Sequence, residues 1–347
     1  MNEEKLIRLL SPVLGERAQG ALAALAPADG GGAMPPERAP ERVPERVGAA
    51  DLAYALSVAL HQGLLDRVPT GRAYVAERLA AGGRVMLDHG ALRTIRLPGG
   101  ESTGALPAGA AAFARLLEPL GYRRAGVYPL DRLKMTGYAW CHAGQPQALA
   151  QYFVSELHVE RFSPEFQAAA RRLFGTTRDP LTGAARASLD RIAAQGWLAM
   201  EEAAALLPVL AGTFDRHHDV PALADYEALK QESAEAAWIA TEGNAFNHGT
   251  DRVDDLDATV AAQRAAGRAM KDRIEVSGNG RVRQTATRAD RVDRPFIGAD
   301  GQTVTMSVPG SFYEFISRDV DPETGALDLR FDSGNAQGIF RMTALDA

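Results

Sequence analysis

Two histidines and one glutamate stand out in this sequence by their type and setting. His89 lies in the segment DHGALR, His248 in FNHGT and Glu314 in SFYEFISR. The neighbouring residues are mostly small or apolar, which suits a buried pocket. Two neutral imidazoles and one carboxylate on one face of a metal ion leave the opposite positions open, and this is the usual protein ligand set of non-haem Fe(II) oxygenases. If the three segments meet in space, the sequence predicts a metal-dependent oxygenase.

An arginine follows the first histidine at a spacing that keeps both on one side of the chain. His89 and Arg93 are four residues apart, so they share a face in a strand and nearly do so in a helix. Beside a metal, such an arginine can donate two parallel hydrogen bonds to a carboxylate of an anionic substrate. The alternative is a structural histidine near a surface arginine.

Glu314 gives the sharpest single signal. Because successive side chains of a strand point to opposite faces, Glu314 would share one face with Phe312 and Ile316. A carboxylate in so apolar a strand is costly to bury unless it is paired or bound to a metal. Arg318 falls on the same face, so a structural Glu314–Arg318 bridge is the alternative to a metal ligand.

The other candidates carry weaker signals. We expect His248 to lie on a loop, where Gly249 permits close backbone approach and the imidazole can point into a cavity. A solvent-facing or capping histidine is the alternative. Glu156 and His158 alternate with apolar residues in a predicted strand and share a face, which makes them the rival ligand pair.

The elements that position these residues follow from hydrophobic periodicity. Helical spacing predicts helices over 2–26, 51–81, 109–121, 163–211 (with breaks near Gly175 and Gly196) and 254–267. Strands are predicted over 84–95, 136–142, 149–158, 272–276, 281–288, 303–308 and 311–318. The sum is an α+β chain, in which a curved mixed or antiparallel β-sheet encloses the metal site and helices surround it. We expect one catalytic domain over 1–347, interrupted at 27–48 by a flexible insert with a glycine run and three Pro-Glu-Arg repeats.

Composition excludes several classes of protein. A formal charge of −6 argues against a nucleic-acid partner, because phosphate binding needs a basic face. One cysteine, Cys141, excludes an internal disulfide and a multi-cysteine metal site and fits a reducing compartment. No stretch approaches the roughly 20 apolar residues that span a bilayer, and the start lacks a secretory pattern. We therefore expect a cytoplasmic protein without a membrane partner; the sequence leaves its oligomeric state open.

Five short motifs, taken together, resemble those of a known family, the 2-oxoadipate dioxygenase/decarboxylases or hydroxyglutarate synthases. The motifs are DHGALRTI, VSEL, FNHG, QTAT and YEFISR, and they occur in the family's order within residues 50–320. Each motif is weak alone, whereas the ordered set is specific. The family's fold resembles the vicinal-oxygen-chelate architecture, a curved sheet that encloses a metal, with added helices.

The resemblance also implies roles for individual residues. By position, His89, His248 and Glu314 match the family's metal ligands, and Fe(II) is the implied metal. Arg93 matches a catalytic, substrate-binding arginine, and Arg288 matches a second anion-binding arginine.

The implied reaction is the conversion of a small-molecule 2-oxo acid, 2-oxoadipate, and O2 to 2-hydroxyglutarate and CO2 in lysine breakdown. The substrate supplies its own 2-oxo acid group, so no separate 2-oxoglutarate is consumed. Three alternatives stay open: an oxygen-independent metal-dependent lyase or isomerase, the same oxygenase chemistry on another 2-oxo acid, and a non-catalytic protein that binds a metal or a 2-oxo acid.

Overall fold

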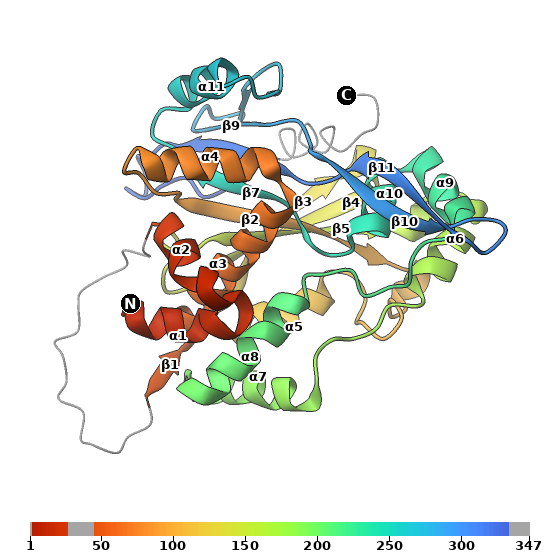
Figure 1. The fold of residues 1–347 in the computed structure, drawn as a ribbon, viewed down its shortest axis with the longest axis horizontal. Coiled ribbons are helices and arrows are strands. Elements are labelled where there is room, and N and C mark those ends of the chain that lie inside the picture. The colour runs from red at the N-terminus through yellow and green to blue at the C-terminus, as the bar shows by residue number, and fades with distance from the viewer. Residues whose placement is uncertain (1, 27–44, 333–347) are drawn as a thin grey trace.

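A curved, mixed sheet of eight strands forms the centre of the computed structural model, which describes residues 2–26 and 45–332 (Figure 1). Neighbouring strands are antiparallel except for the pairs β2–β5 and β7–β12, which are parallel. The prediction of an α+β fold with a curved mixed sheet is confirmed. From edge to edge, the strands are β3 (Tyr122–Leu130), β4 (Met135–His142), β5 (Gln151–His158), β2 (Leu87–Arg96), β7 (Phe246–Arg252), β12 (Phe312–Arg318), β9 (Val282–Ala286) and β8 (Glu275–Val276).

Two antiparallel ribbons lie outside this sheet. One joins β1 (Arg46–Gly48) to β6 (Trp197–Ala199), and the other joins β10 (Arg291–Ile297) to β11 (Thr303–Pro309). Most of the predicted insert, residues 27–44, lies outside the described residues. Residues 46–48, at the end of the insert predicted over 27–48, form β1 and pair with β6.

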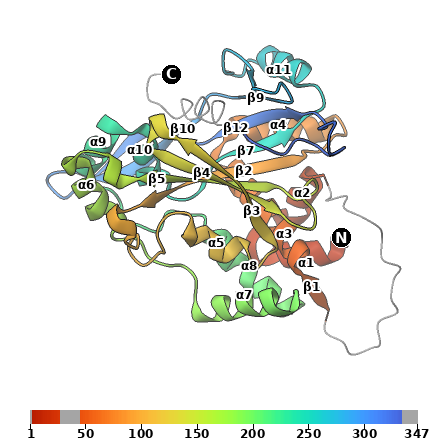
Figure 2. The ribbon, with the colours of Figure 1, turned by 180° about the vertical axis from the view of Figure 1, so that it is seen from behind.

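Helices cover one face of the sheet and the ends of its strands (Figures 1 and 2). Helices α1, α2, α3, α5, α7 and α8 gather on one side, whereas α6, α9 and α10 lie near the β10–β11 ribbon. Their bounds are α1 (Glu3–Leu14), α2 (Ala18–Ala24), α3 (Ala49–Arg67), α4 (Pro69–Ala80), α5 (Ala111–Leu117), α6 (Pro164–Phe174), α7 (Gly183–Gln195), α8 (Met200–Gly212), α9 (Leu223–Glu232), α10 (Ala234–Glu242) and α11 (Leu256–Ala265).

The long helical segment predicted over 51–81 is divided by a proline. Pro69 occupies the first turn of α4, where its missing N–H costs nothing, while its ring disfavours continuation of α3 past Arg67. Helix α3 then lies close against β7. A Cβ at Gly249 would come within 2.8 Å of the Leu64 side chain, so the glycine permits this approach.

Side chains alternate between two environments across the central strands. On one face, Leu92, Tyr313 and Phe315 join the large core formed with the N-terminal helices. On the other face, His89 and Glu314 border a pocket. A second core, with α6, α9, α10 and the β10–β11 ribbon, includes Ile95 of β2 and Leu157 of β5. The sheet therefore has one face devoted to packing and one that holds the candidate site.

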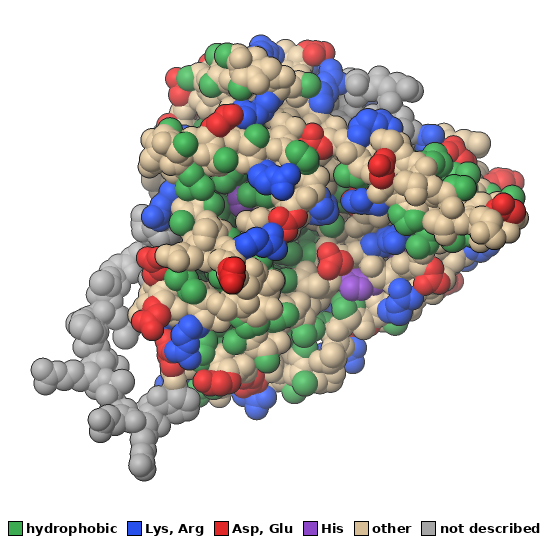
Figure 3. Space-filling model, viewed as in Figure 1, with side chains coloured by type: hydrophobic (Ala, Val, Ile, Leu, Met, Phe, Trp, Pro, Cys, Tyr) green, Lys and Arg blue, Asp and Glu red, His purple; other side chains and the backbone are tan. Residues whose placement is uncertain are grey.

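The surface adds little to the functional argument. On the face in Figure 3, acidic and basic side chains are intermixed, without a broad patch of one sign. Within residues 2–26 and 45–332, no helix combines the length and apolar character needed to cross a bilayer.

Candidate metal centre

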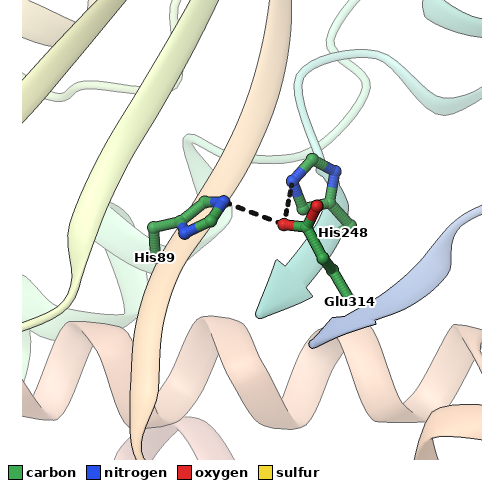
Figure 4. Close-up of side chains that lie close together, drawn as sticks. All are labelled: His89, His248 and Glu314. Atoms are coloured by element: carbon green, nitrogen blue, oxygen red, sulfur yellow. Dashed lines mark ion pairs between the residues drawn. The ribbon is translucent and has the colours of Figure 1, made fainter. Parts of the chain in front are cut away.

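The two histidines and the glutamate singled out in the sequence meet on the pocket face of the sheet (Figure 4). His89 Nε2 lies 3.1 Å from Glu314 Oε2, and His248 Nε2 lies 3.4 Å from the same oxygen. One potential ligand atom from each of the three residues lies within 4.8 Å of the other two. All three side chains are buried, with Glu314 at 0% exposure. Segments separated by more than 60 residues thus form one compact cluster.

The register of the three central strands produces this cluster. Thr250 on β7 stands opposite His89 on β2 and opposite Glu314 on β12. His248, two residues earlier on β7, stands opposite Phe312, and their rings stack at 4.8 Å. Residues opposite one another in adjacent strands project to the same face about 5 Å apart. His248 is therefore a central strand residue, and the prediction that it lies on a loop is wrong.

A pocket lies over the cluster, with about 400 Å³ of empty space if the open solvent at its mouth is included. Its walls combine the three polar side chains with aromatic and small residues, a mixture typical of small-molecule sites. The lining residues are His89, Ala91, Phe153, Ser155, Asn247, His248, Gln284, Glu314, Phe331 and Asp332.

The cluster fits a divalent metal ion. Glu314 Oε1 is buried and has no hydrogen-bond partner among the described residues, a costly state unless another group binds it. Burial lowers the pKa of His248 to about 3, so its imidazole is neutral at physiological pH and retains a lone pair for a metal. Ligand atoms that share one metal ion, with bonds of about 2.1 Å, lie roughly 3 to 3.5 Å apart. The two distances to Glu314 Oε2 match that spacing.

Asp88 and Arg318 support His89 on the side of its ring that faces away from the cluster. Asp88 Oδ1 accepts a hydrogen bond from His89 Nδ1 at 2.8 Å, which leaves Nε2 toward the cluster. Burial alone would lower the pKa of His89. The hydrogen bonds and charges of Asp88 and Glu314 have a larger opposite effect, so the pKa of His89 is raised overall. Burial would raise the pKa of Asp88, but the Arg318 guanidinium holds it well below its usual range.

Arg318 therefore has a different partner from the one considered in the sequence. It donates two hydrogen bonds to Asp88, at 2.8 and 2.9 Å. The alternative of a structural Glu314–Arg318 bridge is wrong, because the cation on this strand pairs with the carboxylate beside His89. Glu314 instead accepts a hydrogen bond from the Thr250 hydroxyl at 2.5 Å.

Arg93 lies on the same face of β2 as His89, farther along the strand from the cluster. It stands opposite Ser155, a pocket-lining residue, and its side chain is fully buried. Its guanidinium lies 4.9 Å from the centre of the Trp238 ring. Burial lowers the pKa of Arg93 to about 10, and the charge of Glu235 opposes that shift; the side chain remains cationic at neutral pH.

The remaining predicted residues lie elsewhere. The Arg288 side chain is about one-third exposed and lies 3.5 Å from Asp272, and it does not line the pocket. Glu156 accepts a hydrogen bond from the backbone N–H of Ala110, and His158 Nε2 lies 2.8 Å from the Thr136 hydroxyl. The rival pair therefore has partners outside the cluster, and it occupies the opposite face of β5 from Ser155.

Several supporting residues were missed. Asp88 orients His89, Thr250 contacts Glu314, and Asn247 lies 2.9 Å from His248 Nδ1 through its side-chain amide. Each is a short polar residue within one or two positions of a proposed metal ligand. That position was the signal in the sequence that could have identified it. Phe331, by contrast, packs edge-on to His89 at 4.9 Å and is distant in the sequence, so no local pattern marks it.

The curved sheet with its flanking helices is the fold of a glyoxalase superfamily protein of known structure. A solved structure of a glyoxalase superfamily protein from Ralstonia eutropha JMP134 is 51% identical, covers 96% of this chain and 100% of its own, and has a TM-score of 0.88. The hydroxyglutarate synthase from Oryza sativa, in complex with 2-oxoadipate, has the same fold at 21% identity, with a TM-score of 0.67 over 89% of this chain and 98% of its own.

The chain belongs to the 2-oxoadipate dioxygenase/decarboxylase family, whose model matches residues 56–326. A rice relative, the chloroplastic/amyloplastic 2-oxoadipate dioxygenase/decarboxylase, is 26% identical over 311 residues, which cover 81% of this chain and 76% of the relative. The family resemblance predicted from the five motifs is confirmed.

Proposed function

We propose that this protein is an Fe(II)-dependent dioxygenase that converts 2-oxoadipate and O2 to 2-hydroxyglutarate and CO2. The observation that carries the proposal is the convergence of His89, His248 and Glu314 within 4.8 Å beneath a pocket. Two histidines and a carboxylate are the usual ligands of Fe(II) in oxygenases. When bound there, the iron would supply Lewis acidity toward a 2-oxo acid and the electrons that O2 needs in order to react.

The protein's own groups prepare the site for that chemistry. Asp88 holds the His89 ring with Nε2 directed to the cluster, and Thr250 fixes one oxygen of Glu314. Phe153 and Phe331 pack against each other at 4.8 Å in the pocket wall. Such walls limit water around the reacting groups and strengthen electrostatic interactions inside the pocket.

Arg93 is the proposed binding residue for a substrate carboxylate. Its charge is buried beside Trp238 and lies on the strand face of the cluster. A buried guanidinium can donate two hydrogen bonds to a carboxylate and so hold the acid in one orientation. Arg288 stays a proposal for a second anion-binding residue, although its side chain lies toward Asp272 and solvent.

The names of related proteins support the choice of substrate. The rice relative is named for 2-oxoadipate, and the rice hydroxyglutarate synthase structure contains 2-oxoadipate. We further propose that the chain works as one catalytic domain, because its described helices pack against a single large sheet. Lysine breakdown and a cytoplasmic location belong to the same proposal; the one cysteine, Cys141, fits a reducing compartment.

Product analysis tests the reaction class. The Fe(II)-loaded protein is incubated with 2-oxoadipate in air and under argon, and products are identified by mass. We expect 2-hydroxyglutarate and CO2 in air and neither product under argon. Equal product formation in both atmospheres would favour an oxygen-independent lyase or isomerase. Turnover in air of a different 2-oxo acid, with 2-oxoadipate unreactive, would preserve the chemistry and replace the substrate.

A further inference from the structure

Asn247 immediately precedes the proposed ligand His248 and contacts its ring. Its side-chain amide lies 2.9 Å from His248 Nδ1, and the residue is only 2% exposed. The carboxamide oxygen, Oδ1, is buried and has no hydrogen-bond partner within residues 2–26 and 45–332. Buried polar atoms are nearly always paired, because an unpaired one is costly. The orientation of this carboxamide therefore calls for an explanation.

The position of the proton on the His248 ring decides which amide atom can face that ring. A neutral imidazole has one N–H, on either Nδ1 or Nε2. As the carboxamide lies, its nitrogen Nδ2 faces Nδ1, an arrangement in which Nδ1 accepts and the ring proton is on Nε2. A metal bound to Nε2 needs the lone pair of that nitrogen, which places the proton on Nδ1. Two N–H groups cannot hydrogen-bond to each other, so an acceptor must then face Nδ1.

A half-turn of the carboxamide about the Cβ–Cγ bond of Asn247 provides that acceptor. The two ends of a carboxamide are similar in size, and a torsion of this kind is broad and roughly twofold, so the exchange needs little repacking. Oδ1, which lacks a partner as the side chain lies, would then accept from His248 Nδ1–H. The amide NH2 would take the place of Oδ1. Because Asn247 lines the pocket, an oxygen of a bound acid can accept from that NH2 group.

The other histidine of the cluster already has an acceptor in the corresponding place. Asp88 immediately precedes His89 and accepts from His89 Nδ1 through Oδ1 at 2.8 Å. Such an acceptor fixes the orientation of the ring and leaves Nε2 for a metal. The charge of Asp88 is balanced by Arg318, whereas an amide oxygen at His248 adds no buried charge that would need a partner of its own.

We propose that Asn247 is a positioning residue for His248: with a metal on His248 Nε2, the carboxamide oxygen of Asn247 accepts from Nδ1–H and holds the ring toward the cluster. Asn247 thereby raises the metal affinity without contacting the ion. The assignment rests on the metal site of the proposed function. Two replacements of similar size should therefore differ, because Asn247→Asp keeps an acceptor at Nδ1 and Asn247→Leu removes it.

Zinc affinity tests the assignment without turnover. Zn(II) is titrated against a competing chelator in the wild type, Asn247→Leu, Asn247→Asp and the control Asn244→Leu, and thermal unfolding of each metal-free protein is measured. Asn244 is a buried asparagine whose amide donates to the Arg93 carbonyl and not to a histidine. We expect Asn247→Leu to bind zinc roughly 10–100-fold more weakly than the wild type. Asn247→Asp and Asn244→Leu should stay within about threefold of it, or bind more tightly.

The Nδ1 proton of His248 gives a second readout, which decides the matter even if Asn247→Asp does not fold. NMR of the zinc-loaded protein with isotope-labelled histidine detects the Nδ1–H groups of the zinc-bound rings. One of these protons should shift upfield and exchange faster with water in Asn247→Leu, because it has lost its acceptor. Asp88→Asn should perturb the other one.

The outcomes separate this inference from the function on which it rests. Wild-type zinc affinity in Asn247→Leu, or a loss no larger than in Asn244→Leu, would overturn the assignment while the metal site stands. Equal losses in Asn247→Leu and Asn247→Asp would also overturn it, because the amide NH2 would then be the group that the ring needs. So would an Nδ1 proton that is unchanged in Asn247→Leu. If the wild type binds no zinc, the metal site of the proposed function is itself contradicted.

Discussion

Arg318 donates hydrogen bonds from Nε and Nη2 to the two carboxylate oxygens of Asp88, at 2.8 and 2.9 Å. Asp88 in turn accepts from His89 Nδ1 at 2.8 Å. The third nitrogen of the guanidinium, Nη1, donates to the backbone carbonyls of Asp328 and Arg330. One arginine thus connects the orientation of a proposed metal ligand to the segment that carries the aromatic wall of the pocket.

Replacing Asp88 by asparagine should weaken metal binding without touching a proposed ligand. The partner of a metal-bound histidine typically contributes 10–100-fold to metal affinity, so we expect a loss in that range for Asp88→Asn. The metal-free protein should also lose about 3–5 kcal/mol of unfolding free energy, because Arg318 is left as an unpaired buried charge. Metal titration and denaturant unfolding measure the two effects.

A double variant separates these effects. Asp88→Asn/Arg318→Met removes both charges, so it should recover part of the stability but not the metal affinity. Unchanged metal affinity in Asp88→Asn would show that the hydrogen bond to His89 does not orient a ligand.

Removing a proposed ligand should eliminate the metal and leave the protein folded. In His248→Ala and Glu314→Ala, two side chains remain, too few to hold the ion against dialysis. Within the described residues, Glu314 accepts a hydrogen bond from the Thr250 hydroxyl and otherwise faces the two histidines of the cluster, so we expect the fold to persist without it. Metal content per chain and thermal unfolding are the measurements. His158→Ala, from the rival pair on the other face of β5, is the matched control and should retain its metal. Full occupancy in either cluster variant would reject the assignment.

Arg93→Met should separate substrate binding from metal binding. Loss of one partner of a buried charge pair costs about 2–5 kcal/mol, so 2-oxoadipate affinity should fall by that amount while iron content stays at the wild-type level. Calorimetry under argon measures the affinity. Arg288→Met provides a comparison at an exposed arginine. Wild-type affinity in Arg93→Met would remove Arg93 from the substrate site.

Acid should destabilise the protein partly through His218. Burial lowers the pKa of His218 to about 4 in the folded state, against about 6.5 in the unfolded chain. The unfolded state therefore binds more protons between these values, so the unfolding free energy falls as the pH drops from about 6.5 to 4. His218→Gln has no titrating ring and can still donate to the Ala240 carbonyl.

The His218→Gln variant should lose less stability across that pH range, by about 3 kcal/mol at most. Denaturant unfolding at several pH values gives the comparison. Parallel pH curves for the variant and the wild type would contradict the assignment of this effect to His218.

Elements with regular periodicity could be predicted from the sequence, whereas strands without a clear alternation were missed. The strand predicted over 84–95 is β2, and the one over 311–318 is β12, because apolar residues alternate along both. Strand β7 was missed since both of its faces are buried and its polar residues serve the site. Strand β3 was missed as well: it is an edge strand with exposed charges and contains Pro129.

The candidate ligands could be chosen from residue type and context, but their partners could not. Glu314 was conspicuous because a carboxylate in an apolar strand is costly to bury. Which cation would pair with which carboxylate depended on the register between β2, β7 and β12, and no local pattern fixes that register. The alternative pairing of Arg318 with Glu314 was therefore wrong, and Asp88 was not recognised as its partner.

Oxygen consumption tests the central claim most directly. The protein is loaded with Fe(II) under argon, transferred to buffer with a known O2 content, and given a limiting amount of 2-oxoadipate. The account predicts uptake of one O2 for each 2-oxoadipate consumed, with an equal amount of 2-hydroxyglutarate formed, and no uptake by Glu314→Ala. Consumption of 2-oxoadipate without oxygen uptake, or no reaction with any 2-oxo acid, would contradict it.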